Sequence, residues 1–295
     1  MATSFIDLHC HSTASDGTLS PTQVVNLAKQ AGVSAMSLTD HDTAAGVKEA
    51  SDEAALQGID FISGIEISCE FRGPGTMHLL GYGIDPSSAS LADLSAELIG
   101  NRNDRNPRII RQLNELGVVV TMKEWEDESG GHVVGRPHLA AILVRKGYVS
   151  SVKQAFDKYL GQGGAAYFDK ERVPPRRALE LTYAAGGIPV LAHPFQLRCT
   201  NDAELETVVK NMVDLGLVGV EVMHSDHDIA LVERYTKLAD RFGLVKTGGS
   251  DYHGASKKTI DFGWSHGQRV PREFYDQLVE VHRKHHRPAT QTVAS

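Results

Sequence analysis

The sequence has few cysteines, no long apolar run and no excess of basic charge. Its three cysteines, Cys10, Cys69 and Cys199, are widely spaced and odd in number, which indicates free thiols in a reducing compartment rather than a disulfide framework. No stretch approaches the roughly 18 apolar residues of a membrane span. The first residues, MATSFIDLHC, lack the basic and apolar regions of a signal peptide. We therefore expect a soluble, cytoplasmic protein that makes no membrane contact.

The charge balance argues against a protein that coats nucleic acid. The chain carries 30 Lys+Arg against 37 Asp+Glu, a formal net charge of −7. Non-specific binding of nucleic acid depends on a basic face that neutralises phosphates, so we expect this protein not to bind duplex DNA. A local basic pocket is still compatible with this composition. With 295 residues, of which 41% are hydrophobic, the chain is long enough for a large buried core, and this excludes global disorder.

Short apolar segments alternate with amphipathic ones along most of the chain. Ser20 and Pro21 are typical of a helix start and Gly32 of a helix end. Such alternation is typical of βα units around a parallel sheet or barrel. We expect strands at 5–11, 35–39, 60–71, 77–84, 188–192, 219–223 and 244–248, and helices at 21–31, 43–57, 175–185, 202–215, 228–242 and 272–284.

One internal segment has a different composition. From 85 to 172 the sequence is polar, helical in pattern and rich in arginine. We interpret 85–172 as an inserted helical subdomain that binds substrate. Segments 1–84 and 173–287 would then form the barrel that carries a metal site, and 288–295 would form a polar tail.

Eight of the 14 histidines lie within or just after predicted strands. Asp7, His9 and His11 follow a period of two, so on a strand they project from one face. The C-terminal strand ends of α/β barrels are where catalytic groups gather. Imidazole and carboxylate are ligands of Zn, Mn and Fe, and a carboxylate can bridge two ions. The further groups at these ends, which exceed the needs of one ion, are His41, Glu66, His78, His193, Asp251 and His253.

Six sequence elements in this order resemble the polymerase and histidinol phosphatase (PHP) superfamily: DLHCHS (7–12), TDHD (39–42), Glu66, His78, AHP (192–194) and SDYH (250–253). The resemblance implies a distorted (βα)7 barrel that holds two to three divalent ions, with Mn expected first and Zn or Fe as alternatives. It implies one ion held by His9, His11, Glu66 and Asp251, a second by Glu66, His78 and His193, and a third by Asp16, His41 and His253.

Position 16 departs from members that have histidine there. Aspartate is a hard oxygen ligand, so Asp16 favours Mn over Zn, although the segment Ser15–Thr18 is also an ordinary turn sequence. The resemblance further suggests that Asp7 and Asp40 orient ligand imidazoles through their second ring nitrogen.

The predicted insertion narrows the resemblance. Its segments NRNDRNPRI (101–109) and GRPH (135–138) are similar to small stand-alone members that act on nucleoside 3′,5′-bisphosphates, a subgroup that includes enzymes trimming RNA from the 5′ end. The implied activity is hydrolysis of the 3′-phosphate of a bisphosphate such as pAp by a metal-bridged hydroxide. Trimming of short RNA from the 5′ end is a second activity that this resemblance leaves open.

Each candidate residue has an expected role. A guanidinium group can form bidentate hydrogen bonds with phosphate oxygens, so the arginines of the insertion would hold the phosphate of the substrate that is not hydrolysed. A solvated helix surface is the alternative for the 102–108 cluster, and a helix cap or ligand support is the alternative for His224 and His227. The expected catalytic groups are His9, His11, Glu66, Asp251 and His138, and the expected substrate-binding groups are Arg102, Asn103, Arg105, Asn106, Arg136, His138, His224 and His227.

Three other functions fit the motifs less well. A histidinol phosphate phosphatase would need an acidic partner for the substrate ammonium rather than an arginine-rich insertion. A non-catalytic metal-binding regulatory module should have lost several of the ligands, which are all present here. A metal-dependent amide hydrolase would have no use for the arginine cluster.

Overall fold

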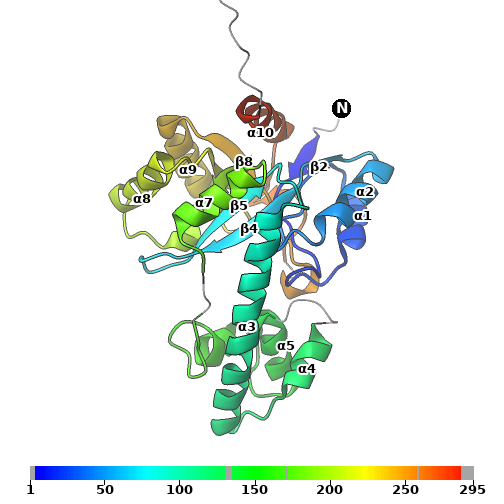
Figure 1. Cartoon of the computed structure of the whole chain (residues 1–295), viewed down its shortest axis with the longest axis vertical. Coiled ribbons are helices and arrows are strands. Elements are labelled where there is room, and N and C mark those ends of the chain that lie inside the picture. Colours follow the sequence, from blue (N-terminus) through cyan, green and yellow to red (C-terminus); the bar gives the residue numbers. More distant parts are fainter. Residues whose placement is uncertain (1–3, 130–134, 170–171, 258, 287–295) are drawn as a thin grey trace, which may run out of the picture.

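The computed structural model describes residues 4–129, 135–169, 172–257 and 259–286 (Figure 1). Its strands form a three-stranded sheet in the order β1-β2-β3, a five-stranded sheet in the order β4-β5-β6-β7-β8, and the short pair β9 and β10. The strand bounds are β1 Phe5–Asp7, β2 Val33–Met36, β3 Asp60–Phe61, β4 Gly64–Cys69, β5 Met77–Tyr82, β6 Ile188–Leu191, β7 Gly219–Met223, β8 Val245–Gly248, β9 Trp264–Ser265 and β10 Gln268–Arg269.

Hydrogen bonds join the two larger sheets on both sides. After β1, Leu8 N–H donates to Gly248 O (3.1 Å), and Asp251 N–H donates to His9 O (2.8 Å). Beyond β2, Glu66 N–H donates to Asp40 O (3.2 Å), and a parallel bridge pairs His41 with Glu66. The two larger sheets are therefore linked at both edges through the segments that follow β1, β2 and β8, as expected of the distorted barrel that the resemblance implied.

Strand β5 runs antiparallel to both β4 and β6, which corrects the expectation that every site residue follows a strand end. Only residues 70–76 connect β4 to β5, and a parallel crossover needs about a dozen residues or more. His78 therefore lies at the start of its strand, opposite Ser68 near the end of β4. The reversal still places His78 on the same rim of the barrel as the other groups.

Two other predicted strands are shorter than expected. The single strand predicted over 60–71 is divided, because β3 pairs with β2 whereas β4 pairs with β5, and the chain changes partner between them. Strand β1 ends at Asp7, and residues 8–11 continue beside the 248–252 segment.

Most helices begin and end close to the predicted positions. Ser20 and Gln23 form a capping box at the start of α1, and Gly32 ends it in the left-handed conformation (φ 89°). The α-helices are α1 Pro21–Ala31, α2 Val47–Gln57, α3 Ala89–Glu115, α4 Met122–Glu128, α5 Arg136–Arg145, α6 Val152–Ala155, α7 Pro175–Ala184, α8 Asp202–Asp214, α9 Ile229–Phe242 and α10 Arg272–His285. Short π or 3₁₀ turns are η1 Phe156–Leu160, η2 Pro194–Leu197 and η3 Gly254–Lys257.

Helix α3 connects two separate apolar cores (Figure 1). Leu91 and Leu94 in its first half pack into the barrel core, whereas Ile109 and Leu113 in its second half pack with α4, α5 and the segment that follows. Pro107 lies inside this one helix and neither starts a second helix nor ends the first. Within the described residues, no helix is both long and apolar enough to cross a membrane.

Candidate metal centre and the adjoining cavities

The metal-ligand candidates lie at one rim of the barrel, where backbone segments approach closely. His9 and His11 are carried by the segment after β1, and Asp251 by the segment after β8. Gly249 makes this approach possible, because a Cβ there would stand 2.4 Å from the Cβ of His9. The nine residues that the resemblance implied as metal ligands all lie at this rim, and they are His9, His11, Asp16, His41, Glu66, His78, His193, Asp251 and His253.

Two of these residues have a strained backbone. Asp251 has a φ of 56° and His193 a φ of 23°, values that residues other than glycine seldom adopt. Hydrogen bonds hold both in place: Asp251 N–H donates to His9 O (2.8 Å), and His193 N–H donates to Glu221 Oε2 (2.8 Å). Strain of this kind costs roughly 1–3 kcal/mol per residue and is concentrated at functional sites.

Glu66 is the centre of the cluster. Its Oε1 lies 2.8 Å from His78 Nδ1 and 2.8 Å from His193 Nε2. Its Oε2 lies 2.8 Å from His41 Nδ1, 3.3 Å from His11 Nε2 and 3.4 Å from His9 Nε2. One carboxylate therefore faces five imidazoles with both of its oxygens, as expected of a ligand that bridges two ions.

Two further carboxylates complete the arrangement. Asp251 Oδ1 lies 3.2 Å from His11 Nε2, and Asp16 Oδ1 lies 3.2 Å from His253 Nε2. His11, Asp16, His41 and His253 form one group with ligand atoms within 4.8 Å of one another. This group contains the whole third set that the resemblance implied.

The residues present suit divalent cations. Within the described part of the chain, buried His9 Nε2, both ring nitrogens of His11, Glu66 Oε2 and His193 Nδ1 make no hydrogen bond. Buried polar atoms without a partner are costly, and a bound cation would satisfy them.

The protonation states agree with this interpretation. Burial lowers the pKa of His11 to about 3 and that of His78 to about 4, so both rings are neutral. Burial raises the pKa of Glu66, but the nearby histidines have the larger effect, with His41 contributing most, and they hold this pKa well below its usual value. His9 differs: burial lowers its pKa, but Glu221 and Glu66 outweigh burial and raise it well above normal. Metal binding at His9 would therefore release a proton.

Glu221 is a site residue that the sequence analysis missed. This fully buried carboxylate of β7 places Oε1 3.0 Å from His9 Nδ1, and its Oε2 accepts the His193 N–H at 2.8 Å. It therefore holds two ligand-bearing segments at once. A single acid inside the otherwise apolar strand GVEVM was the available signal.

The roles expected for Asp7 and Asp40 are wrong. Asp7 accepts hydrogen bonds from Ser250 N–H (3.0 Å) and Gly263 N–H (2.7 Å), and Asp40 accepts from Ser12 N–H (2.8 Å). Both carboxylates therefore hold the backbone of the ligand-bearing loops rather than orienting an imidazole, which Glu221 does instead.

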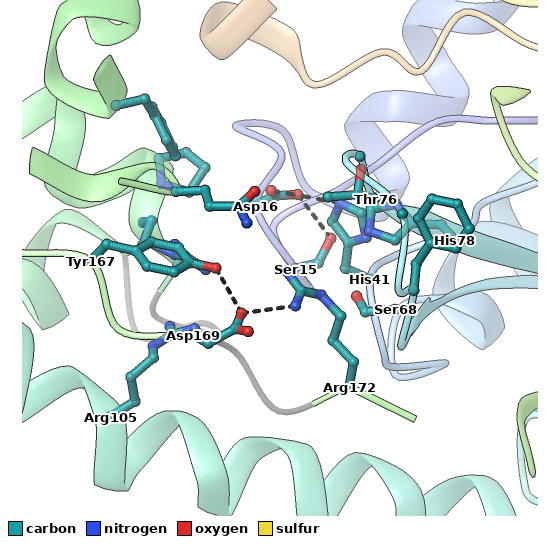
Figure 2. Close-up of a pocket in the computed structure, with 18 residues that line it drawn as sticks. Ser15, Asp16, His41, Ser68, Thr76, His78, Arg105, Tyr167, Asp169 and Arg172 are labelled. Atoms are coloured by element: carbon teal, nitrogen blue, oxygen red, sulfur yellow. Dashed lines mark hydrogen bonds and ion pairs between the residues drawn. The ribbon is translucent and has the colours of Figure 1, made fainter. Parts of the chain in front are cut away.

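One cavity of about 400 Å³ adjoins the cluster and contains three arginines (Figure 2). We call it the arginine cavity, defined by Arg105, Arg136 and Arg172. Asp16, His41 and His78 of the cluster also line it. Arg136 donates to Leu160 O (2.8 Å) and stacks on the Tyr167 ring at 5.1 Å, and burial lowers its pKa. Arg172 was not among the residues predicted to bind substrate.

A second cavity of about 660 Å³ opens on the same cluster, and its wall includes Glu66, His193 and Asp251. We call it the lysine cavity, because Lys257 lines it and its Nζ forms an ion pair with Asp251. Asp16, His41 and His78 belong to the walls of both cavities, as do Pro137 and Phe156. The remaining wall combines apolar residues, among them Ala141, Val144 and Val152, with polar and charged ones that include the ion pair of Glu128 and Arg145.

The residues predicted to bind substrate are placed differently from one another. Arg105 and Arg136 line the arginine cavity, and Asn106 is buried and accepts a hydrogen bond from Arg105 (2.9 Å). The side chains of Arg102 and Asn103 lie outside the part of the chain that the structure describes.

The three histidines predicted to contact substrate, His138, His224 and His227, line neither cavity. Gly135 N–H donates to His138 Nδ1 (3.2 Å) at the start of α5, so that ring caps the helix, and its catalytic role stays a prediction. His224 and His227 are fully buried, and their contact with substrate stays a prediction. His224 Nε2 lies 3.3 Å from Asp251 Oδ2 of the cluster, and His227 Nδ1 lies 3.0 Å from Val222 O.

The family model described as the PHP domain matches residues 7–280. This chain belongs to the PHP family. Among its relatives are a 5′-3′ exoribonuclease from Haemophilus influenzae, 37% identical over 84% of this chain and 89% of that protein, and a 3′,5′-nucleoside bisphosphate phosphatase from Chromobacterium violaceum, 32% identical over 90% and 92%. A phosphoribosyl 1,2-cyclic phosphate 1,2-diphosphodiesterase from Eggerthella lenta is 34% identical over 90% and 98%.

Solved structures confirm the fold of this PHP protein. A Chromobacterium violaceum protein described as an amidohydrolase with bound sulfate and no metal has a TM-score of 0.83 and 30% identity, covering 93% of this chain and 97% of that one. A putative metal-dependent phosphoesterase from Bifidobacterium adolescentis also has a TM-score of 0.83, with 27% identity, covering 95% and 96%. The family, the mixed α/β fold and the phosphoesterase relationship expected from the motifs are thereby confirmed.

Proposed function

We propose that this PHP protein is a metal-dependent phosphatase that removes the 3′-phosphate from nucleoside 3′,5′-bisphosphates such as pAp, giving the nucleoside 5′-monophosphate and phosphate. The observation that carries the proposal is the arginine cavity beside the histidine and carboxylate cluster. A bisphosphate needs two anion sites, and this arrangement provides two of different chemistry. The relatives named as a bisphosphate phosphatase and an exoribonuclease support the same substrate class.

The nine rim residues are the proposed holders of two to three divalent ions. Bound ions would neutralise phosphate charge and supply a nucleophile from water near neutral pH. Glu66 is the proposed bridge, since both of its oxygens face imidazoles from different strands. Three residues of the set, Asp16, Glu66 and Asp251, are carboxylates, and these hard oxygen ligands favour Mn over Zn.

The chain's own role at the second phosphate is to hold it with guanidinium groups. Arg136 is fixed by Leu160 O and the Tyr167 ring, so little side-chain entropy is lost when it binds an anion. Asp169 accepts from Tyr167 Oη (2.7 Å) and from Arg172 Nη1 (2.8 Å), which orients Arg172 beside the cavity (Figure 2). We expect these arginines to select for a substrate that carries a second anionic group.

The alternative functions are disfavoured by the same cavity. The ammonium group of histidinol phosphate would meet Arg105, Arg136 and Arg172. Of the two acids in this wall, Asp169 already pairs with Arg172, and Asp16 is one of the proposed metal ligands. An amide substrate would leave the guanidinium groups without an anion. A non-catalytic module would have no reason to keep several groups of three or four His, Asp and Glu residues whose ligand atoms lie, within each group, no more than 4.8 Å apart.

A phosphate-release assay with added Mn tests the proposal. Phosphate should be released from pAp, with AMP as the second product, and not from AMP or histidinol phosphate. The Arg136→Ala variant should lose about tenfold or more in kcat/KM on pAp and much less on a simple 3′-monophosphate, because only the bisphosphate uses the arginine. Equal losses on both substrates would refute the anchoring role, and phosphate release from AMP would refute the position of attack.

A further inference from the structure

Asp251 uses its two carboxylate oxygens differently. Oδ1 faces the histidine cluster and lies 3.2 Å from His11 Nε2 and 3.6 Å from His9 Nε2. Oδ2 has other partners: it accepts a hydrogen bond from Lys257 Nζ, with which it forms an ion pair, and it lies 3.3 Å from His224 Nε2. A ligand carboxylate that is hydrogen-bonded through its second oxygen has a defined orientation toward the cation.

Two hydrogen-bond donors meet at Oδ2. His224 is fully buried, and its Nδ1 accepts the Asp226 N–H (3.0 Å). A neutral ring with an accepting Nδ1 carries its proton on Nε2, which is the atom beside Asp251. Lys257 is the stronger of the two donors, because its ammonium carries a full charge. Its removal should therefore disturb Oδ2 more than any other single loss at this oxygen.

A fixed turn carries Lys257. This residue ends η3, which begins at Gly254 directly after the SDYH motif. Gly254 has a φ of 66°, and a Cβ there would overlap Thr18 Oγ1, so a larger residue would displace Thr18. The Ala255 N–H also donates to Thr18 Oγ1 (2.8 Å). The backbone that leads to Lys257 is therefore held against the loop before α1, at the rim of the barrel.

We propose that Lys257 is a positioning residue for the candidate metal ligand Asp251: by holding Oδ2, its ammonium leaves Oδ1 as the atom that binds the cation. The inference rests on the proposed function, because it takes the rim cluster to hold Mn. Lys257 lines the lysine cavity and its side chain is 37% exposed, so the ammonium also faces the space open to a bound molecule. Direct contact with the substrate phosphate is therefore the competing role.

Removal of the ammonium has two opposite effects on Mn binding. A positive charge beside a ligand repels a divalent cation, so its loss would by itself strengthen binding. Loss of a hydrogen bond that orients a ligand weakens binding, typically by roughly 10–100-fold. Because the Lys257 side chain is 37% exposed, water screens its charge, whereas the contact with the nearly buried Asp251 is direct. We therefore expect the loss of orientation to dominate.

Chelator competition on the purified protein tests the assignment, because it measures Mn affinity without relying on turnover. Lys257→Met replaces the ammonium by an apolar side chain of similar length and should lower Mn affinity by about tenfold or more. Lys257→Arg keeps a positively charged donor and should restore most of the lost affinity. At saturating Mn, Lys257→Met should regain the wild-type kcat and KM on pAp, since the ligands are intact.

Lys246→Met is the matched control, because Lys246 of β8 forms a similar ion pair with Asp240 of α9 (2.6 Å), which is not a candidate metal ligand. It should leave Mn affinity unchanged. Unchanged or tighter Mn binding in Lys257→Met would overturn the inference, as would equal losses in Lys257→Met and Lys257→Arg.

A raised KM for phosphate esters at saturating Mn, with normal Mn affinity, would assign Lys257 to the substrate instead and would also overturn the positioning role. These outcomes leave the proposed phosphatase intact. Failure of the wild-type protein to bind Mn, or to release phosphate from pAp, would instead refute the proposed function itself.

Discussion

Replacing Glu221 by glutamine should weaken metal binding without touching a metal ligand. Both oxygens of Glu221 accept a hydrogen bond or face a ring nitrogen: Oε1 lies 3.0 Å from His9 Nδ1, and Oε2 accepts from His193 N–H at 2.8 Å. Burial raises the pKa of Glu221, but His9 and its neighbours outweigh burial and lower the pKa to about 2, so the native group is ionised. Glutamine removes this charge and offers one acceptor where two are needed.

The magnitude follows from that geometry. A glutamine can keep its carbonyl oxygen toward only one of the two partners. Its NH₂ group then faces the other partner, the His193 backbone N–H or the His9 ring nitrogen, and two donors would face each other there. Loss of one charge-assisted hydrogen bond in a buried site is worth roughly 1.5–3 kcal/mol. Substitutions of this type reduce metal affinity by roughly 10–100-fold. We expect Mn affinity to fall within that range.

Chelator competition and metal content measured on the purified protein provide the assay. Glu221→Gln should bind Mn more weakly, and its activity on pAp should recover as Mn is raised, because the ligands themselves are intact. Glu180→Gln is the control, since Glu180 lies on α7 and is exposed to solvent. Unchanged Mn affinity in Glu221→Gln would refute the reasoning, as would a loss of activity that saturating Mn does not restore.

Two further perturbations have defined outcomes. Removal of metal by a chelator should abolish phosphate release and lower the Tm by about 5–10 °C, because ions present at 100 times their Kd contribute about 2.7 kcal/mol; an unchanged Tm would contradict this. Burial lowers the pKa of His227 to about 3, so below its unfolded value of 6.5 only the unfolded state takes up the proton, and stability falls as pH drops. The test is urea unfolding of the metal-free protein at pH 7 and at pH 5. Between these pH values the free energy of unfolding should fall by about 2 kcal/mol less in His227→Gln than in the wild type. Equal decreases in both proteins would show that His227 does not contribute.

The cluster of candidate metal ligands was the most predictable part of this protein. Its ligands occur in short motifs, and period two on a strand is a local geometric rule, so His9 and His11 could be placed on one face from spacing alone. The alternation of strands and helices was predictable for the same reason, since each βα unit carries its own pattern. The orientation of β5 was not, because it depends on the short 70–76 connection rather than on any hydrophobic period.

Residues that act through another side chain were harder to find. Glu221 and Asp7 are both lone acids on buried strands, and their sequence contexts do not distinguish them. Only the three-dimensional register shows that Glu221 meets His9, whereas Asp7 meets the backbone of Ser250 and Gly263. The burial of His224 and His227 likewise depends on how α9 packs on β7, because Tyr235 of α9 contacts the His227 ring at 4.7 Å.

The distribution of charge explains how an acidic chain of net charge −7 can be expected to bind a polyanion. The acids at the rim belong to the cluster, where cations would neutralise them, and the field that a substrate meets is local rather than global. Arg105 and Arg136 come from α3 and α5, and Arg172 follows the same helical segment, whereas the cluster ligands come from the barrel strands and their loops. Substrate selection and phosphoryl chemistry are therefore assigned to different parts of the chain. Changes in the arginines should alter which phosphate ester is preferred, and changes at the rim should alter hydrolysis of every ester alike.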